Sequence, residues 1–142
     1  MRNILVATDG SDGASRAVDT AAELAEAVAG TLSIMTVGTT RNVEEQVQFA
    51  RVEGDLADAA ETFARQILND AEQQVRQAGA GAPKINLAWG DPAETIIEAV
   101  RQENIDAVVI GRRGRGQLAG LLLGSVSQKL ASLAPCIVIV VP

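Results

Sequence analysis

Five short apolar runs alternate along this chain with segments of helical periodicity, and this alternation limits the choice of fold more than any other feature. The runs are nearly continuous in Val, Ile, Leu and Ala, which is typical of parallel strands buried on both faces. Strands that alternate with helices predict an α/β fold with right-handed crossovers. The predicted strands are Ile4–Thr8, Leu32–Val37, Lys84–Trp89, Ala107–Ile110 and Ile137–Val141.

Helical periodicity fills most of the sequence between these runs. Ser11 or Asp12 is placed to cap the first helix, and Asp91 before Pro92 marks the start of another. The segment from Gly38 to Asp55 has mixed charge and no clear period, which indicates a surface segment near the site. The predicted helices are Asp12–Ala29, Leu56–Gln77, one that begins at Pro92, and Val126–Leu133.

The composition narrows the function classes. A length of 142 residues is that of one domain, so residues 1–142 are expected to fold as a single unit. Hydrophobic residues make up 47% of the chain, which excludes a disordered protein. Aromatic residues make up only 2% and the net charge is −6, so a surface that stacks bases or follows a nucleic-acid backbone is not expected.

The single cysteine and the apolar runs bear on location. Cys136 excludes an internal disulfide, suits a reducing cytoplasm and is expected to act as a packing residue. The first apolar run is too short for a signal peptide and leads directly into Asp9. No apolar segment approaches the roughly 20 residues that span a bilayer. We therefore expect a cytoplasmic protein that does not insert into membranes.

Histidine and tyrosine are absent, which removes several kinds of chemistry. Catalysis by a serine or cysteine that is activated by histidine is excluded, and so are the most common metal ligands. No residue is evidently placed as a general base, so no catalytic residue is predicted. Any metal ion is expected to arrive with a ligand rather than to be held by side chains.

The most specific motif is the glycine-rich segment from Gly111 to Ser125, which follows an apolar strand and precedes a helix. This order directs backbone N–H groups at a phosphate, and the glycines allow the backbone to approach it closely. The segment also contains Arg112, Arg113 and Arg115, although the chain as a whole is acidic. The local positive charge favours an anionic ligand, although solvated loop arginines are an alternative.

Two other phosphate motifs match this segment only in part. Gly114 to Ala119 has the spacing GxGxxA, but an apolar strand stands where the acidic ribose ligand of a dinucleotide fold is expected. Gly111 to Gly116 has the spacing GxxxxG, but Gln117 follows where a Walker A loop has lysine. Neither motif describes the segment as well as Gly-x-x-Gly, nine residues, Gly-Ser.

That last spacing resembles the nucleotide-binding motif of the universal stress protein family, and the resemblance extends over essentially the whole chain. The first strand with Asp9-Gly10-Ser11 and the final Ala134-Pro135-Cys136 before an apolar strand are similar to that family too. Ala7 is a departure, because many relatives have proline there. The resemblance implies a three-layer, Rossmann-like sandwich of the adenine nucleotide alpha hydrolase type, with a five-stranded parallel sheet in the order 3-2-1-4-5.

In that strand order the first and fourth strands are neighbours, so Asp9 and the Gly111–Ser125 segment flank one crevice. The resemblance assigns Asp9 to the ribose or base, Val37 to main-chain contact with adenine, and Ser125 and Ser127 to the β- and γ-phosphates. Plain helix capping remains an equal interpretation for the two serines, and a turn residue that only caps the first helix remains the lesser alternative for Asp9. The residues expected to contact the nucleotide are Ala7, Thr8, Asp9, Val37, Ile110, Gly111, Arg112, Arg113, Gly114, Gly124, Ser125, Val126 and Ser127.

The resemblance therefore implies an ATP-binding protein with a regulatory or stress-response role, with AMP and ADP as alternative ligands and Mg²⁺ carried by the phosphates. It also implies a homodimer through the last strand, Cys136 to Val141, and an unidentified protein partner. Two alternatives stay open at this point. One is a slow enzyme that hydrolyses ATP or transfers a phosphoryl or adenylyl group, and the other is a dimeric interaction module without a ligand.

Overall fold

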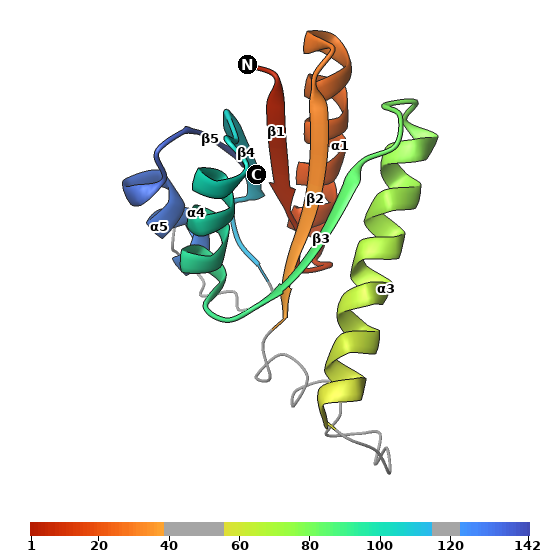
Figure 1. Cartoon of the computed structure of the whole chain (residues 1–142), viewed down its shortest axis with the longest axis vertical. Coiled ribbons are helices and arrows are strands. Elements are labelled where there is room, and N and C mark those ends of the chain that lie inside the picture. Colours follow the sequence, from red (N-terminus) through yellow and green to blue (C-terminus); the bar gives the residue numbers. More distant parts are fainter. Residues whose placement is uncertain (39–55, 115–122) are drawn as a thin grey trace.

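The computed structural model describes residues 1–38, 56–114 and 123–142. Within them, the strands form one parallel sheet in the order β3-β2-β1-β4-β5, and helices cover both faces (Figure 1). The predicted three-layer α/β fold and its strand order are confirmed. The strands are β1 (Asn3–Ala7), β2 (Thr31–Gly38), β3 (Lys84–Trp89), β4 (Ala107–Gly111) and β5 (Ile137–Val141). The helices are α1 (Asp12–Val28), α3 (Leu56–Gln77), α4 (Pro92–Gln102) and α5 (Ser125–Leu133).

The predicted elements are found with small shifts at their ends. The first helix ends at Val28, one residue before the prediction, because Ala29 adopts a left-handed φ of 52° as the C-cap. Thr8 was expected within the first strand but follows it, and Ser125 is already the first residue of α5. The surface segment predicted beyond Gly38 lies outside the described residues, as does Arg115.

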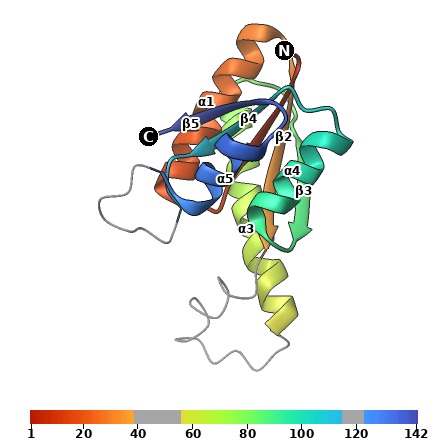
Figure 2. The ribbon, with the colours of Figure 1, turned by 90° about the vertical axis from the view of Figure 1, so that its left-hand side faces the viewer.

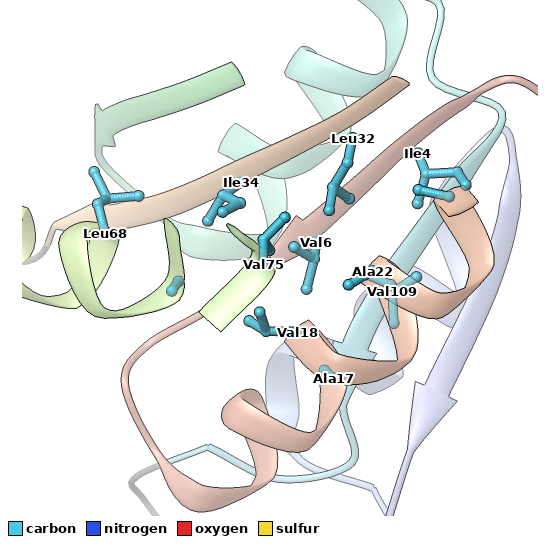
Figure 3. Packing of buried hydrophobic residues seen from close by; sticks show 13 residues of the cluster. Ile4, Val6, Ala17, Val18, Ala22, Leu32, Ile34, Leu68, Val75 and Val109 are labelled. Carbon is cyan, nitrogen blue, oxygen red and sulfur yellow. The ribbon is translucent and has the colours of Figure 1, made fainter. Parts of the chain in front are cut away.

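One half of the core lies between the sheet and the pair α1 and α3. Aliphatic side chains of the central strands point toward small residues of α1, which lets the helix approach the sheet closely (Figure 3). Each large aliphatic side chain that is fully buried in this way contributes roughly 1.5–3 kcal/mol to the stability of the fold. The labelled residues of this cluster are Ile4, Val6, Ala17, Val18, Ala22, Leu32, Ile34, Leu68, Val75 and Val109.

The other half of the core lies beneath α4 and α5, which lie on the face turned to the viewer in Figure 2. Leu5, Val108 and Leu130 are fully buried there. Cys136 packs at the margin of this cluster, as expected of a packing residue, and partial burial raises the pKa of its thiol. β1 and β4 are buried on both faces, so packing on both sides determines where they end. The ends of these two strands in turn determine where the segments after them begin.

The two edge strands are less covered than the centre. Ile85 of β3 and Ile137 of β5 are exposed, and Trp89 is exposed although its ring lies over Gly38. The expectation of strands buried on both faces therefore holds for the centre of the sheet but not for its edges. No helix of the described residues is both long and apolar enough to cross a membrane.

The opposite edge of the sheet, where the strands begin, is fixed by a carboxylate. Asp106 Oδ2 accepts hydrogen bonds from the main-chain N–H groups of Arg2 and Asn3, each at 2.8 Å. These two bonds hold the pKa of Asp106 below its ordinary value. The carboxylate thereby joins the start of β1 to the start of β4, the two strands whose other ends form the site described next.

Candidate functional site

A cleft of about 480 Å³ opens where β1, β2 and β4 end and α1, α4 and α5 begin. The connection after β1 leads to the α1 face of the sheet and the one after β4 leads to the α5 face, so the two diverge at this edge. All of the predicted contact residues except Arg112 line this cleft. They are Ala7, Thr8, Asp9, Val37, Ile110, Gly111, Arg113, Gly114, Gly124, Ser125, Val126 and Ser127.

The turn after β1 is fixed by hydrogen bonds within the chain. The hydroxyl of Thr36 donates to the carbonyl of Thr8 at 2.6 Å. Asp9 Oδ1 accepts from the N–H of Ser11 at 2.9 Å, and Gly10 between them has a φ of 79°. A positive φ at this point favours glycine. The alternative interpretation of Asp9 as a turn residue is thus correct for one of its two carboxylate oxygens.

The second carboxylate oxygen of Asp9 faces the glycine-rich segment. A Cβ built at Gly114 would overlap Asp9 Oδ2, so a side chain there displaces either the carboxylate or the backbone. The two sequence signals, Asp9 and the Gly-x-x-Gly spacing, therefore meet in space. Glycine at 114 lets the backbone of the segment pass directly beside the carboxylate.

The main chain of Arg112 joins the two described ends of the glycine-rich segment. Its N–H donates to the carbonyl of Val141 at 2.7 Å, and its carbonyl accepts from the N–H of Gly124 at 2.8 Å. The same carbonyl accepts from the Ser127 hydroxyl at 2.8 Å. Arg112 was predicted to contact the ligand, but it is absent from the residues that line the cleft, because its backbone is engaged on the β5 side.

The two serines of the motif differ in their surroundings. Ser127 is 2% exposed, and its hydroxyl lies within hydrogen-bonding distance of the Arg112 and Gly124 carbonyls. Ser125 is exposed at the first position of α5. The local structural role that was weighed for these serines thus describes the hydroxyl of Ser127, whereas Ser125 is an exposed residue that lines the cleft.

The start of α5 has a backbone arranged for an acceptor. Its N-cap is Gly124, in extended conformation, and no side chain of the described residues caps it. The first N–H groups of a helix have no partner within the helix, and together with the helix dipole they favour a negative charge. The start of α5 lies in the wall of the cleft, through Gly124, Ser125 and Val126.

The charges around the cleft are mixed. Asp9 and Asp91 contribute carboxylates, while Arg113 and Lys129 contribute cations. Arg113 Nε is buried and has no hydrogen-bond partner among the described residues. A buried donor without a partner costs roughly 1–3 kcal/mol, so an acceptor supplied by a ligand would relieve that cost. Among the described residues, no group of three or more His, Cys, Asp or Glu side chains is placed to hold a metal ion.

Several lining residues were missed by the sequence reasoning, although signals for some were present. The beginning of α4 follows the end of β3, at the same sheet edge as the ends of β1 and β4, which places Asp91 and its neighbours there. Lys129 follows Ser125 by one helical turn, and Ala14 follows Ser11 in the same way. The missed residues are Ser11, Ala14, Met35, Asp91, Pro92, Ala93, Ile96 and Lys129.

A parallel sheet in this order, with a cleft at its carboxyl edge, defines the class of Rossmann-like α/β proteins. The model of the universal stress protein family matches residues 1–142. Universal stress protein YxiE of Bacillus subtilis is 32% identical, and the match covers 97% of each chain. The chain belongs to the universal stress protein family.

Solved structures agree with this assignment. Universal stress protein UspA from Lactobacillus plantarum is similar with a TM-score of 0.83 at 26% identity, over 99% of this chain and 97% of that chain. A universal stress protein whose structure is in complex with cAMP is similar with a TM-score of 0.73 at 28% identity, over 99% of this chain and 95% of that chain.

Proposed function

We propose that this chain binds an adenine nucleotide in the cleft between β1 and β4, with ATP as the first ligand and AMP and ADP as alternatives. The observation that carries the proposal is the convergence of three anion-binding features in one cleft. These are the start of α5, which no described side chain caps, the buried Nε of Arg113, which has no partner among the described residues, and the backbone at Gly114, where a side chain would overlap Asp9. The neighbour in complex with cAMP supports an adenine nucleotide as the ligand class.

The lining of the cleft supports one orientation of the nucleotide. Met35, Val37 and Ile96 line the cleft with apolar surface, which suits an adenine ring. Asp9 lies between this apolar part and the glycine-rich segment, where a ribose hydroxyl would meet a carboxylate. The phosphates then point toward Arg113 and the first N–H groups of α5. In this orientation Gly114 is beside the phosphates rather than the base.

Mg²⁺ enters this proposal only as the partner of the phosphates. The carboxylates that line the cleft are those of Asp9 and Asp91, and each accepts a hydrogen bond from the main chain, at Ser11 and Glu94. Most ligands of a bound Mg²⁺ would therefore be phosphate oxygens and water, as Mg²⁺ prefers. Its chemical contribution is to neutralise phosphate charge.

The proposal is tested by binding to the purified protein. Native mass spectrometry of freshly purified protein is expected to show a co-purified adenine nucleotide, and calorimetry with Mg²⁺ and ATP is expected to show one site per chain. Guanosine triphosphate serves as the matched control, since it has the same phosphates and a different base. Equal affinity for ATP and guanosine triphosphate, or no binding of either nucleotide, would reject an adenine-specific site.

We also propose that binding rather than turnover is the activity. The described residues offer no histidine, and the carboxylate of Asp9 is engaged in its own turn. Hydrolysis of ATP slower than about 1 s⁻¹, below the range of ordinary enzymes, is therefore expected. A faster rate that disappears with substitution of Asp9 would place the protein among the enzymes.

A regulatory or stress-response role in the cytoplasm, with a dimer and a protein partner, completes the proposal. Support for the dimer comes from β5, an edge strand whose backbone groups are open to pairing. Apolar side chains are exposed there too: Ile137, the first residue of β5, is 54% exposed, and Leu133 at the end of α5 is 63% exposed. Light scattering is expected to show a closed dimer at micromolar concentration and a monomer for Ile137→Lys. A monomeric unaltered protein contradicts the dimer without affecting the nucleotide site.

A further inference from the structure

Two glycines bring the start of α1 and the end of β4 into backbone contact. Gly13 is the second residue of α1, and Gly111 is the buried last residue of β4. A Cβ at Gly111 would lie 2.9 Å from the carbonyl carbon of Gly13 and 3.1 Å from the nitrogen of Ala14. No side chain therefore separates the helix from the strand end at this point.

The contact continues into the glycine-rich segment. A Cβ at Gly13 would lie 3.0 Å from the carbonyl oxygen of Arg113. Gly13 is not among the residues that line the cleft, yet the peptide it faces joins two residues that do, Arg113 and Gly114. Gly13 thus lies behind the site, against the reverse side of a peptide that forms its wall.

The residue before that peptide, on its N-terminal side, is fixed by hydrogen bonds to β5 and to the start of α5. The N–H of Arg112 donates to the carbonyl of Val141 at 2.7 Å. The carbonyl of Arg112 accepts from the N–H of Gly124 and the hydroxyl of Ser127, both at 2.8 Å. The segment is therefore held between α1 on one side and β5 with the start of α5 on the other.

The geometry of a peptide bond transmits any displacement to the cleft. The peptide between Arg113 and Gly114 is planar and trans, like all the described peptide bonds, so its C=O and N–H point in opposite directions. When the carbonyl points at α1, the N–H of Gly114 points away from α1. A push on the carbonyl therefore shifts the N–H of Gly114, a residue that lines the cleft at the proposed phosphate end.

We infer that Gly13 is a positioning residue for the phosphate end of the nucleotide site, because its missing side chain sets the place of the peptide between Arg113 and Gly114. The inference rests on the proposed function. It assigns Gly13 no contact with the ligand. It separates the phosphate end, which depends on Gly13, from the apolar end of the cleft, which is built by β2 and α4.

The test compares Gly13→Ala with the unaltered protein by calorimetry with ATP and with adenosine, which has no phosphates. A displacement of a few tenths of an ångström weakens one hydrogen bond to the phosphate, which is worth about 1 kcal/mol, so the affinity for ATP is expected to fall about fivefold. The affinity for adenosine is expected to stay unchanged. The melting temperature is not expected to fall, since alanine is a better helix former than glycine.

Ser15→Ala is the matched control in the same helical turn. Its hydroxyl contacts Gln74 on α3 at 3.3 Å, away from the glycine-rich segment, so both affinities are expected to stay unchanged. A second measurement needs no ligand. The amide resonance of Gly114 is expected to move in Gly13→Ala and to stay in place in Ser15→Ala.

The outcomes separate the inference from the proposed function. If Gly13→Ala binds ATP as tightly as the unaltered protein, the positioning role is wrong and nucleotide binding stands. If ATP and adenosine weaken equally, the substitution acts on the whole cleft, and the role at the phosphate end is wrong. If the unaltered protein binds no ATP, the proposed function fails and the inference fails with it.

Discussion

The helices α1, α4 and α5 all begin at the cleft, and their first N–H groups are satisfied in different ways. In α1 the hydroxyl of Ser11 accepts from the N–H of Ala14 at 3.2 Å, and in α4 Asp91 accepts from the N–H of Glu94 at 3.0 Å. In α5 the capping position is Gly124, and no described side chain takes that role. Side chains thus cap α1 and α4, whereas among the described residues no side chain caps α5.

This difference explains how one edge can be both stable and open to a ligand. Capping residues stabilise a helix by about 1 kcal/mol each, and glycine gives up part of that contribution. At α5 the corresponding N–H groups are stabilised when a bound anion accepts hydrogen bonds from them. The contrast predicts that changes to the capping residues of α1 and α4 alter mainly stability, while changes at the start of α5 and at Gly114 alter mainly binding.

The largest effect is expected from Gly114→Val, which places a branched side chain where the carboxylate of Asp9 lies. The affinity for ATP is expected to fall by at least about 30-fold, equivalent to about 2 kcal/mol. Ala78→Val, in an exposed turn after α3, is the control and is expected to bind normally. Undiminished binding by Gly114→Val in calorimetry would remove the phosphate end from this cleft.

Gly124→Asp would give α5 the cap that α1 and α4 already have. The φ of −74° and ψ of 170° at Gly124 suit any residue, but a Cβ would lie 3.3 Å from the carbonyl oxygen of Arg112. The gain from the cap and the cost of this contact oppose each other, so the free energy of unfolding is expected to change by at most a few tenths of a kcal/mol. ATP affinity is expected to fall about tenfold, or 1.4 kcal/mol, because a carboxylate now occupies the anion position. Gly124→Asn has the same shape without the charge and should lose less. Unchanged affinity in Gly124→Asp would contradict the proposed role of α5.

Asp91→Ala is the converse experiment at α4. Loss of the cap is expected to lower the free energy of unfolding by about 1 kcal/mol, as measured by urea denaturation. ATP affinity should not fall, since the substitution removes a negative charge from the cleft wall. A variant of full stability that no longer binds ATP would reverse the roles assigned to α4 and α5.

The smallest effect is expected at the opposite edge, where Asp106 accepts from Arg2 and Asn3. Because these bonds lower the pKa of Asp106 in the folded protein, its stabilisation is present above the ordinary aspartate pKa of about 3.9. It is lost as the pH falls through the lowered folded-state value. Asp106→Asn should therefore show a smaller decrease in unfolding free energy between neutral pH and acid than the unaltered protein. Parallel pH profiles would show that Asp106 contributes nothing.

The strands of the sheet were predicted well because each strand is marked by a local run of apolar residues. Continuous apolar runs such as Ile4–Thr8 indicate strands buried on both faces, and the family resemblance supplied the strand order. The two halves of the proposed site were also found, since Asp9 and Gly114 are each marked by their neighbours. Their contact across the cleft is what the structure adds.

The wall formed by α4 could not be predicted in the same way. Asp91 and Pro92 have the pattern of an ordinary helix start, and that pattern is correct, since Asp91 does cap α4. Whether this start also faces the cleft depends on how α4 packs beside α5, which no local pattern encodes. The hydroxyl of Ser127 illustrates the opposite case, because its position in the motif suggested a ligand while its contacts are with the Arg112 and Gly124 carbonyls.

The most direct test of the contrast between the helices is an amide NMR titration of the unaltered protein with ATP and, separately, with adenosine. The N–H resonances of Ser125 and Val126 at the start of α5 are expected to shift with ATP and to stay in place with adenosine. The N–H of Glu94 already donates a hydrogen bond to the carboxylate of Asp91, so its resonance is expected to move little with either ligand. Equal shifts at the starts of α4 and α5, or no ATP-specific shift at Ser125 and Val126, would contradict the account.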